Sequence, residues 1–425
     1  MDDQNPDIVP ETDTPLSEMA ATVQHFKPKI TGLEDLPGPV REIATGLNIL
    51  DQFSRMIERE GWVIGERNVT RLCYLAITSR VLDRPVSLAV KGPSAGGKSF
   101  VTGQVLRFFP DSAYYALTAM SERALVYSEE DLRHRFLVLF EAESLKGDMA
   151  SYFIRSLLSE GRIRYETVES SNTGLSPRLI VKEGPTGLLI TTTATSLHPE
   201  NETRYLSLTV QDTPEQTKAI LRSMATTGIT EEDPSDWIDF QSWIETAEHR
   251  VDIPFARALA DLSNPASVRL RRDFGLLLNL IKAHAILHQL SREQNAKGEI
   301  IASIDDYAVV HELVVAPISE GLGAAVSAAV RETVNVVGQN HQPGDIEAEP
   351  MSLTEVTDKL GVDKSSASRR VKQAIKLGYL SNEELIKGKP MRLYIGEPLP
   401  EEIQVLPRPE ELGFKGKKDV TAAWN

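Results

Sequence analysis

The chain of 425 residues is long enough for two to four domains. Hydrophobic residues make up 41% of it and charged residues 25%, a globular mixture that excludes a wholly disordered or collagen-like chain. Its net charge of −15, from 46 basic and 61 acidic residues, argues against a protein that coats nucleic acid with its whole surface.

The cysteine content and the lengths of the apolar runs bear on where the protein works. The one cysteine, Cys73, cannot form an internal disulfide, and no zinc site can be built from cysteines. We therefore expect a reducing, cytoplasmic environment. The acidic, polar N-terminus does not have the pattern of a signal peptide, and there is no run of about 18 apolar residues that would predict a transmembrane helix.

The first 84 residues divide into two parts. Residues 1–40 carry eight acidic and two basic side chains, frequent prolines and no apolar periodicity, which predicts a disordered acidic tail. Residues 41–84 carry apolar side chains at three- to four-residue spacing and predict N-terminal helices over about 41–60 and 66–82.

Short apolar runs then alternate with helical patterns over residues 85–212. The runs are typical of buried strands and lie at 86–90, 136–140 and 187–191. Strands that alternate with helices predict an α/β core with a parallel sheet. Residues 213–338 have a largely helical pattern and predict a helical lid, whose best helix spans 269–291.

The segment after the first strand matches the phosphate-loop pattern G-x-x-x-x-G-K-[ST]. It consists of Gly92, Pro93, Ser94, Ala95, Gly96, Gly97, Lys98 and Ser99. Its glycines allow successive N–H groups to point at phosphate oxygens, and we expect Lys98 to reach the β- and γ-phosphates and Ser99 to bind Mg²⁺. The helix that follows directs its positive end at the anion, and Phe100 is grouped with the nucleotide-binding residues. A chance match in a glycine-rich turn is the alternative, but the position between a strand and a helix favours a nucleotide site.

The second predicted strand ends in two carboxylates, Glu141 and Glu143. A phosphate-loop NTPase needs acids at such a strand end, one to help hold Mg²⁺ and one to polarise the attacking water. In the usual pattern the acid that holds Mg²⁺ directly precedes the acid that polarises the water. If Glu141 polarises the water, Phe140 stands where the Mg²⁺-binding acid is expected. If Glu141 holds Mg²⁺, Ala142 stands where the water-polarising acid is expected. Glu141 is thus a candidate for both roles, and we favour it as the base with Glu143 as a supporting acid. The alternative is a pair of solvated loop carboxylates.

Five segments in this order resemble a known module. They are GPSAGGKS, LTAMSERAL, FLVLFEAES, SYFIRSLLSEGRI and GPTGLLITTTATSLHPENETRYLSL. Together they resemble the AAA+ helicase module of phage- and mobile-element-type "DNA primase" proteins, which is similar to minichromosome maintenance (MCM) helicases. The resemblance covers about residues 85–290 and implies ATP and Mg²⁺, DNA as a partner and a homo-oligomeric ring such as a hexamer. No primase module is recognisable.

The resemblance also assigns roles to individual positions. It places a polar sensor at the end of the third strand, where Thr192 or Thr193 is the candidate and a β-branched residue without function is the alternative. Arg204 takes the place of an arginine finger that reaches a neighbouring subunit's γ-phosphate, a task that suits a planar, permanently charged guanidinium. Arg269 opens the long lid helix at a second sensor position. For both arginines a solvent-exposed position is the alternative.

A β-hairpin is predicted between the acidic strand and the third strand, from residues 161–168 and 178–182. In MCM-like rings a hairpin at this place carries basic residues onto DNA in the central pore. The resemblance therefore implies DNA contacts by Arg162, Arg164, Arg178 and Lys182. A hairpin at the rim with solvated charges is the alternative.

Residues 345–399 follow a polar linker and predict a small DNA-binding domain. Ser352 and Glu355 form the S-x-x-E pattern of a capping box, a glycine turn follows the first helix, and a second helix ends at Gly378. Two short strands with a basic turn between them complete a pattern that resembles a winged helix-turn-helix domain. Nine basic and six acidic residues over 351–399 give a net charge of +3, as phosphate contacts require. The DNA-binding candidates on the second helix are Lys364, Ser365, Ser366, Ser368, Arg369, Arg370 and Lys372.

The sequence as a whole predicts an ATP-dependent DNA helicase or translocase of MCM-like AAA+ type in mobile-element or phage replication, with a primase or polymerase as the partner to expect. Two alternatives stay open: a DNA-binding AAA+ switch that loads or regulates without unwinding, and an NTPase whose partners, including those of the winged helix, are proteins.

Residues 400–425 predict a loop-like tail. The charge of −15 is an average, because residues 1–40 contribute −6 and the C-terminal domain +3, which confines DNA contact to that domain and the hairpin.

Overall fold

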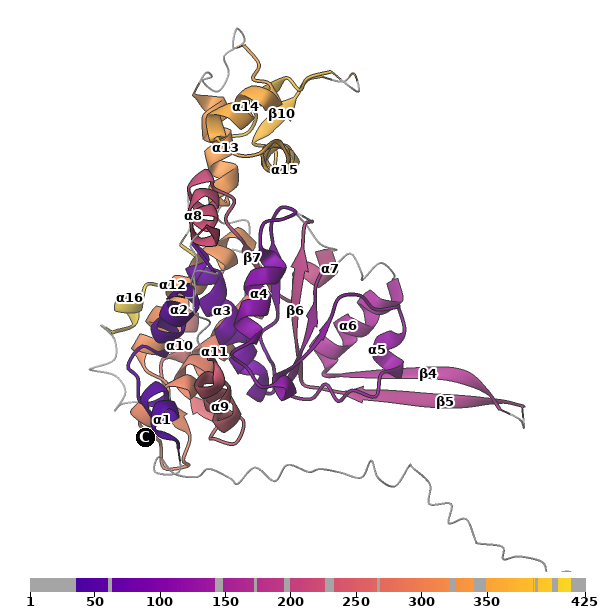
Figure 1. Ribbon diagram of the computed structural model, residues 1–425, viewed down its shortest axis with the longest axis vertical. Coiled ribbons are helices and arrows are strands. Elements are labelled where there is room, and N and C mark those ends of the chain that lie inside the picture. The colour runs from indigo at the N-terminus through magenta and orange to yellow at the C-terminus, as the bar shows by residue number, and fades with distance from the viewer. Residues whose placement is uncertain are drawn as a thin grey trace, which may run out of the picture.

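A five-stranded parallel sheet forms the centre of the protein (Figure 1). The computed structural model describes residues 36–59, 63–141, 148–171, 174–194, 199–225, 233–265, 268–321, 326–339, 349–384, 386, 389–399 and 404–413. The strands are β1 (Leu88–Lys91), β2 (Tyr114–Leu117), β3 (Arg135–Leu139), β6 (Thr186–Thr192) and β7 (Leu206–Thr209), in the order β2-β3-β6-β1-β7. The prediction of an α/β core with a parallel sheet is therefore confirmed.

Burial along the strands follows their place in the sheet. β1 and β6 have neighbours on both sides and are buried at every residue, as expected for parallel strands covered on both faces. β2 and β7, at the two edges, are only partly buried. The sequence analysis predicts β1, β3 and β6 but not the short edge strands β2 and β7, which have accessible positions.

In the part of the chain that the structure describes, three α-helices precede the sheet. They are α1 (Gly38–Ala44), α2 (Ile49–Arg59) and α3 (Arg67–Thr78). Where the periodicity predicts one helix over 41–60, α1 ends before Thr45, and Leu47, an apolar position of that pattern, is 83% exposed. Leu36 and Val40 are buried, so the last residues of the predicted tail belong to the folded part. Residues 1–35 lie outside the described residues.

The main body contains further helices beside those three. They are α4 (Lys98–Leu106), α5 (Ala124–Tyr127), α6 (Asp148–Glu160), α7 (Pro199–Glu202), α8 (Pro214–Met224), α9 (Ser235–Ile244), α10 (Ala256–Leu262), α11 (Leu270–Leu287), α12 (Ile304–Gly321) and α16 (Pro409–Gly413), with a small sheet of β8 (Val251–Asp252) and β9 (Ile300–Ile301). One apolar cluster joins α1–α3, one side of the sheet, α9–α12 and the segment around α16. The predicted lid helix corresponds to α11, and it shares this core with the N-terminal helices. No helix among the described residues is long and apolar enough to cross a membrane.

The end of the chain differs from the loop-like tail that the sequence predicts. Val405 and Leu406 are buried in the main core, and the Tyr307 hydroxyl donates to the Pro407 carbonyl at 2.6 Å. Residues 404–413 therefore pack on α12, because two adjacent apolar side chains find a partner surface that the sequence pattern does not reveal.

A long antiparallel hairpin projects from the body beside the sheet (Figure 1). Its strands, β4 (Arg162–Ser171) and β5 (Gly174–Glu183), pair along their whole length. The predicted hairpin is confirmed, with longer strands than the pattern indicates. Near its base Tyr165 packs against Phe153 of α6, with ring centroids 5.2 Å apart, whereas Val168 and Leu175 further out are exposed.

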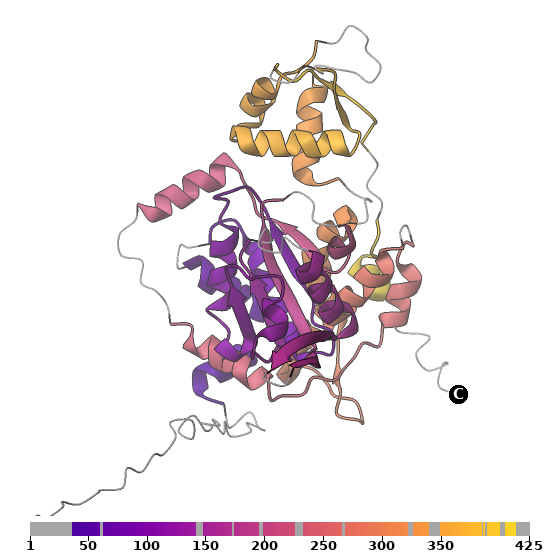
Figure 2. The same ribbon diagram turned by 90° about the vertical axis from the view of Figure 1, so that its right-hand side faces the viewer.

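The C-terminal unit, residues 326–339 and 349–399, has an apolar core of its own. It contains α13 (Ala328–Gly338), α14 (Leu353–Leu360), α15 (Lys364–Lys376) and the antiparallel strands β10 (Leu380–Asn382) and β11 (Leu393–Ile395). The predicted capping box of Ser352 and Glu355 is present at α14. The sequence groups α13 with the lid up to residue 338, but its valines pack on α14 and α15, so it belongs to this unit. The unit lies at one end of the molecule, next to α8 (Figure 2).

Candidate nucleotide site

The phosphate loop lies where the order of the sheet reverses. From β1 the chain crosses to β2 at the far edge, and it returns through β3 and β6 to β7 on the other side of β1. In open parallel sheets, ligands bind outside the carboxyl ends of the strands at such a switch point. Residues 92–97 follow β1 directly and so occupy this position.

The backbone of the loop requires small residues at defined positions. A Cβ atom on Gly92 would lie 2.3 Å from Cγ2 of Val210, so only glycine fits there. Ala95 and Gly97 have φ angles of +61° and +76°, the left-handed region in which glycine is favoured. Gly97 is the N-cap of α4 and offers no side-chain cap, so the first N–H groups of the helix are left for a ligand.

Lys98 lies inside this loop and not on the surface. Its side chain is buried, and Nζ donates a hydrogen bond to the Pro93 carbonyl at 2.6 Å. Burial is the main cause that lowers its pKa, the charge of Arg369 lowers it further, and Glu141 acts in the opposite direction. The lysine therefore shares one electrostatic environment with the end of β3 and with α15 of the C-terminal unit.

Thr191 connects the phosphate loop with the acidic strand end. Its hydroxyl accepts a hydrogen bond from the Glu141 N–H at 2.9 Å and lies 3.3 Å from the hydroxyl of Ser99. The hydroxyl of Thr192 accepts from the Ala194 N–H at 3.0 Å, which is a local turn contact. The sequence resemblance points to Thr192 or Thr193, whereas the geometry favours Thr191, which faces Ser99 at the start of α4.

Glu141 follows β3 with a φ of +71°, and its side chain is exposed. This left-handed conformation is uncommon for a residue with a long side chain and is typical of positions that the surrounding structure holds for function. The other predicted carboxylate, Glu143, and Ala142 lie outside the described residues.

A cavity of about 750 Å³ opens beside the phosphate loop. Its wall includes residues 93–97, Phe100, Gln211 and Asp212, together with apolar residues of α8. On the same wall the buried Glu66 accepts from the Gln211 N–H at 2.7 Å and from Gln216 Nε2 at 2.8 Å, and its burial raises the pKa of this carboxyl. The volume lies in the range of small-molecule sites, and the mixed lining suits a base next to a phosphate chain.

The predicted arginine finger, Arg204, and the predicted sensor arginine, Arg269, are not among the residues that line this cavity. Arg204 donates to the Ser159 hydroxyl at 2.8 Å. Arg269 pairs with Asp273 at 3.2 Å and donates to the Gly321 carbonyl at 2.9 Å. The structure thus places both arginines in polar contacts away from the phosphate loop of their own chain.

An ion pair between Lys91 and Glu202 links the sheet to the Arg204 segment, and sequence reasoning missed it. Lys91 is the last residue of β1, directly before the phosphate loop, and Glu202 lies two positions before Arg204. A lysine at the end of an otherwise apolar strand is the signal that could have indicated a buried partner.

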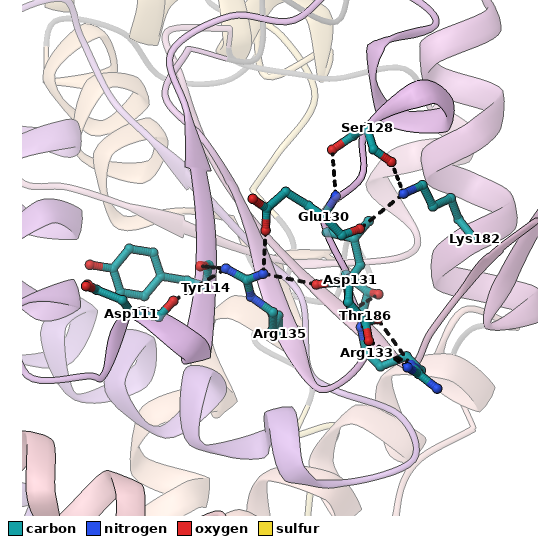
Figure 3. A network of polar contacts seen from close by, with 10 residues as sticks. Asp111, Tyr114, Ser128, Glu130, Asp131, Arg133, Arg135, Lys182 and Thr186 are labelled. Carbon is teal, nitrogen blue, oxygen red and sulfur yellow. Dashed lines mark hydrogen bonds and ion pairs between the residues drawn. The ribbon is translucent and has the colours of Figure 1, made fainter. Parts of the chain in front are cut away.

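The hairpin residues proposed to bind DNA have different environments. Arg178 pairs with Glu169 at 2.6 Å, and Lys182 donates to the backbone carbonyls of Ser128 and Glu130 (Figure 3). Lys182 therefore anchors the base of the hairpin to the segment before β3. Arg162 and Arg164, which are exposed and two residues apart, share one face of β4.

The same segment is fixed to the edge of the sheet by Arg135 (Figure 3). Its guanidinium donates to the Tyr114 carbonyl of β2 and to a carboxylate oxygen of Glu130, both at 2.7 Å. This network explains why the hairpin leaves the body at a defined place.

The candidates on α15 have different environments. Lys364, Ser365 and Lys372 are exposed, Ser368 is half-buried, and Ser366 is buried. Arg369 and Arg370 both pair with Asp212 of the main body, the former at 3.0 Å. Arg370 also pairs with Glu332 of α13 at 2.9 Å. Only part of the predicted DNA-binding set therefore faces solvent.

Comparison with known proteins finds similarity to solved structures only. No protein-family model matches the chain, and no curated protein matches it. Among solved structures it is similar to a full-length MCM homolog from Methanopyrus kandleri, with 13% identity and a TM-score of 0.45, over 65% of this chain and 61% of that one. The chain thus spans about three fifths of that homolog, and a similarity at this level decides nothing about activity.

Proposed function

We propose that the chain is a Mg²⁺-dependent ATPase of AAA+ type that acts on DNA as a helicase or translocase. The observation that carries the proposal is the phosphate loop at the switch point of the sheet, with Lys98 inside it. Ser99, Thr191 and the backbone of Glu141 meet at the same place. This constellation suits phosphoryl transfer, in which positioning and electrostatic stabilisation supply nearly all of the catalysis.

The residues present fit a magnesium nucleotide. The Ser99 hydroxyl and the Glu141 carboxylate are the oxygen donors that Mg²⁺ prefers, and the bound ion would neutralise charge on the β- and γ-phosphates. Lys98 would exchange the Pro93 carbonyl for phosphate oxygens. Glu141 would orient the attacking water, and Thr191 would hold its backbone in place.

The DNA part of the proposal rests on charge and on the pattern of the C-terminal unit. Residues 351–399 carry a net charge of +3, and the order of two helices, α14 and α15, and the antiparallel pair of β10 and β11 supports the proposal of a winged helix-turn-helix domain. Arg162 and Arg164 on the hairpin are the second contact that we propose. In a ring of copies, Arg204 would act on the nucleotide of a neighbouring subunit.

A second candidate function is a DNA-binding ATPase switch that does not unwind. The pairing of Arg369 and Arg370 with Asp212 favours it, because it places the proposed DNA-binding helix against the nucleotide cavity. A motor needs the helix to stay on DNA through many cycles, whereas a switch needs it only in one state.

The test is ATP hydrolysis and unwinding of a forked DNA duplex by the purified chain. We expect DNA-stimulated hydrolysis, and a loss of at least about 100-fold in Lys98→Ala, since the charge on the transferring phosphate loses its partner. Lys297→Ala, at an exposed turn, is the matched control and should retain activity. Hydrolysis that DNA stimulates without strand separation would favour the switch, and hydrolysis that survives Lys98→Ala would contradict the nucleotide site.

A further inference from the structure

Asp212 ties the C-terminal unit to the rim of the nucleotide cavity. Its two carboxylate oxygens accept from Arg369 and Arg370, which are consecutive residues of α15. Asp212 is only 11% exposed and Arg370 6% in their side chains, so this is a shielded contact between the two parts of the chain. Shielded, charge-assisted pairs of this kind are stronger than surface ion pairs and geometrically specific.

The contact lies at the nucleotide cavity itself. Asp212 lines the cavity, and so does Asp363, the N-cap residue of α15. After burial, the charge of Arg369 is the next cause that lowers the pKa of Lys98. The C-terminal unit thus forms part of the wall of the site that the main body provides.

The same arginines cannot serve Asp212 and DNA at once. Both guanidinium groups direct a terminal nitrogen at Asp212, and their Nε atoms are buried without a hydrogen-bond partner. Arg370 is paired with Asp212 through one terminal nitrogen and with Glu332 through the other, so a phosphate could reach it only after the C-terminal unit moves away from the rim. Exchange of a carboxylate for a phosphate keeps the charge pairing of the guanidinium group.

We propose that α15 is shared between the nucleotide cavity and DNA: Asp212 holds Arg369 and Arg370 in a closed state, and DNA phosphates must replace Asp212 before α15 can bind. The proposal rests on the nucleotide- and DNA-binding function proposed above and adds the residue that controls it. DNA binding then opens the cavity wall, and by reciprocity a ligand that stabilises the closed wall weakens DNA binding.

The test compares the full-length variants Asp212→Asn and Glu215→Gln in binding to a labelled DNA duplex, measured by fluorescence anisotropy without nucleotide. The salt concentration is varied between about 50 and 200 mM, because the affinity that phosphate contacts supply changes strongly over this range. Both variants remove one negative charge, but Glu215 is an exposed residue at the start of α8. We expect Asp212→Asn to bind about tenfold tighter than the wild type, with a salt slope steeper by about 0.9, because Arg369 is released whereas Arg370 keeps its pair with Glu332. Glu215→Gln should bind as the wild type does.

Adding Arg369→Gln to Asp212→Asn should return both affinity and slope toward the wild-type values, because the gain depends on the released guanidinium. If Asp212→Asn and Glu215→Gln both bind DNA with equal affinity, the proposal that α15 is shared between the nucleotide cavity and DNA is wrong, and the proposed function is unaffected. DNA binding by neither the wild type nor Asp212→Asn would overturn both together.

Discussion

The phosphate loop and the first half of α15 each place a basic residue near the start of a helix, but they hold it by different means. Lys98 is held by the Pro93 carbonyl five residues earlier, inside a loop whose glycines permit its backbone. Arg369 is held by Asp212, which lies 157 residues away in the chain and in another part of the structure.

This difference separates a site that local sequence builds from a site whose availability depends on a distant partner. The geometry of the phosphate loop follows from its own backbone and from the contact of Lys98 with Pro93, and such preorganisation is what electrostatic catalysis requires. On α15 the geometry is equally defined, but the basic groups are already occupied by a carboxylate. Variants of each region can show whether local preorganisation and distant pairing have the separate effects that we infer.

The largest effect is expected from Ser99→Ala in the phosphate loop. Loss of the hydroxyl removes a proposed Mg²⁺ ligand and the contact with Thr191, so turnover of ATP should fall by about 100-fold. Ser99→Thr keeps the hydroxyl and should retain most of the turnover. Steady-state hydrolysis at saturating Mg²⁺ measures both, and equal turnover of the alanine and threonine variants would show that position 99 does not act through its hydroxyl.

A smaller effect, about tenfold on turnover, is expected from Thr191→Val. The substitution keeps the β-branched shape and removes the hydroxyl that accepts from the Glu141 N–H, so the acidic strand end loses its support beside Ser99. Thr192→Val removes a hydroxyl that contacts only its own turn and should cost less. If Thr192→Val costs more than Thr191→Val, the sensor position lies where the sequence resemblance places it.

The phosphate loop and the threonines at the end of β6 differ in how well the sequence predicts them. The phosphate loop was predictable residue by residue, because its pattern specifies a local backbone. Three successive threonines at the end of β6 are equivalent in sequence, and only the register with β1 and the contact with Ser99 distinguish Thr191. The basic half of α15 indicates an anionic partner but not its kind, since carboxylate and phosphate suit a guanidinium equally well.

The smallest effect concerns the start of α15, where local capping and the distant contact meet. Asp363 accepts hydrogen bonds from the side chain and N–H of Ser365 and from the N–H of Ser366, and these hold the pKa of its carboxyl well below the ordinary range. A depressed folded-state pKa means that the carboxylate stabilises the fold above its ordinary pKa of about 4 and loses this contribution as the pH falls through the folded value.

Asp363→Ala should therefore cost about 1 kcal/mol in the local stability of α15 at neutral pH, measured as faster hydrogen exchange of its first amides. Asp363→Asn is the matched control: asparagine caps nearly as well and does not titrate, so its exchange should differ little from the wild type at neutral pH. As the pH falls below about 4, the wild-type carboxylate begins to be protonated and the asparagine side chain does not titrate. The exchange rate of the wild type, corrected for the intrinsic rate, should therefore rise relative to that of the asparagine variant. If alanine leaves exchange unchanged while Asp212→Asn accelerates it, α15 is held at its start by the distant pair and not by its own cap, and the comparison between local and distant control extends to the helix itself.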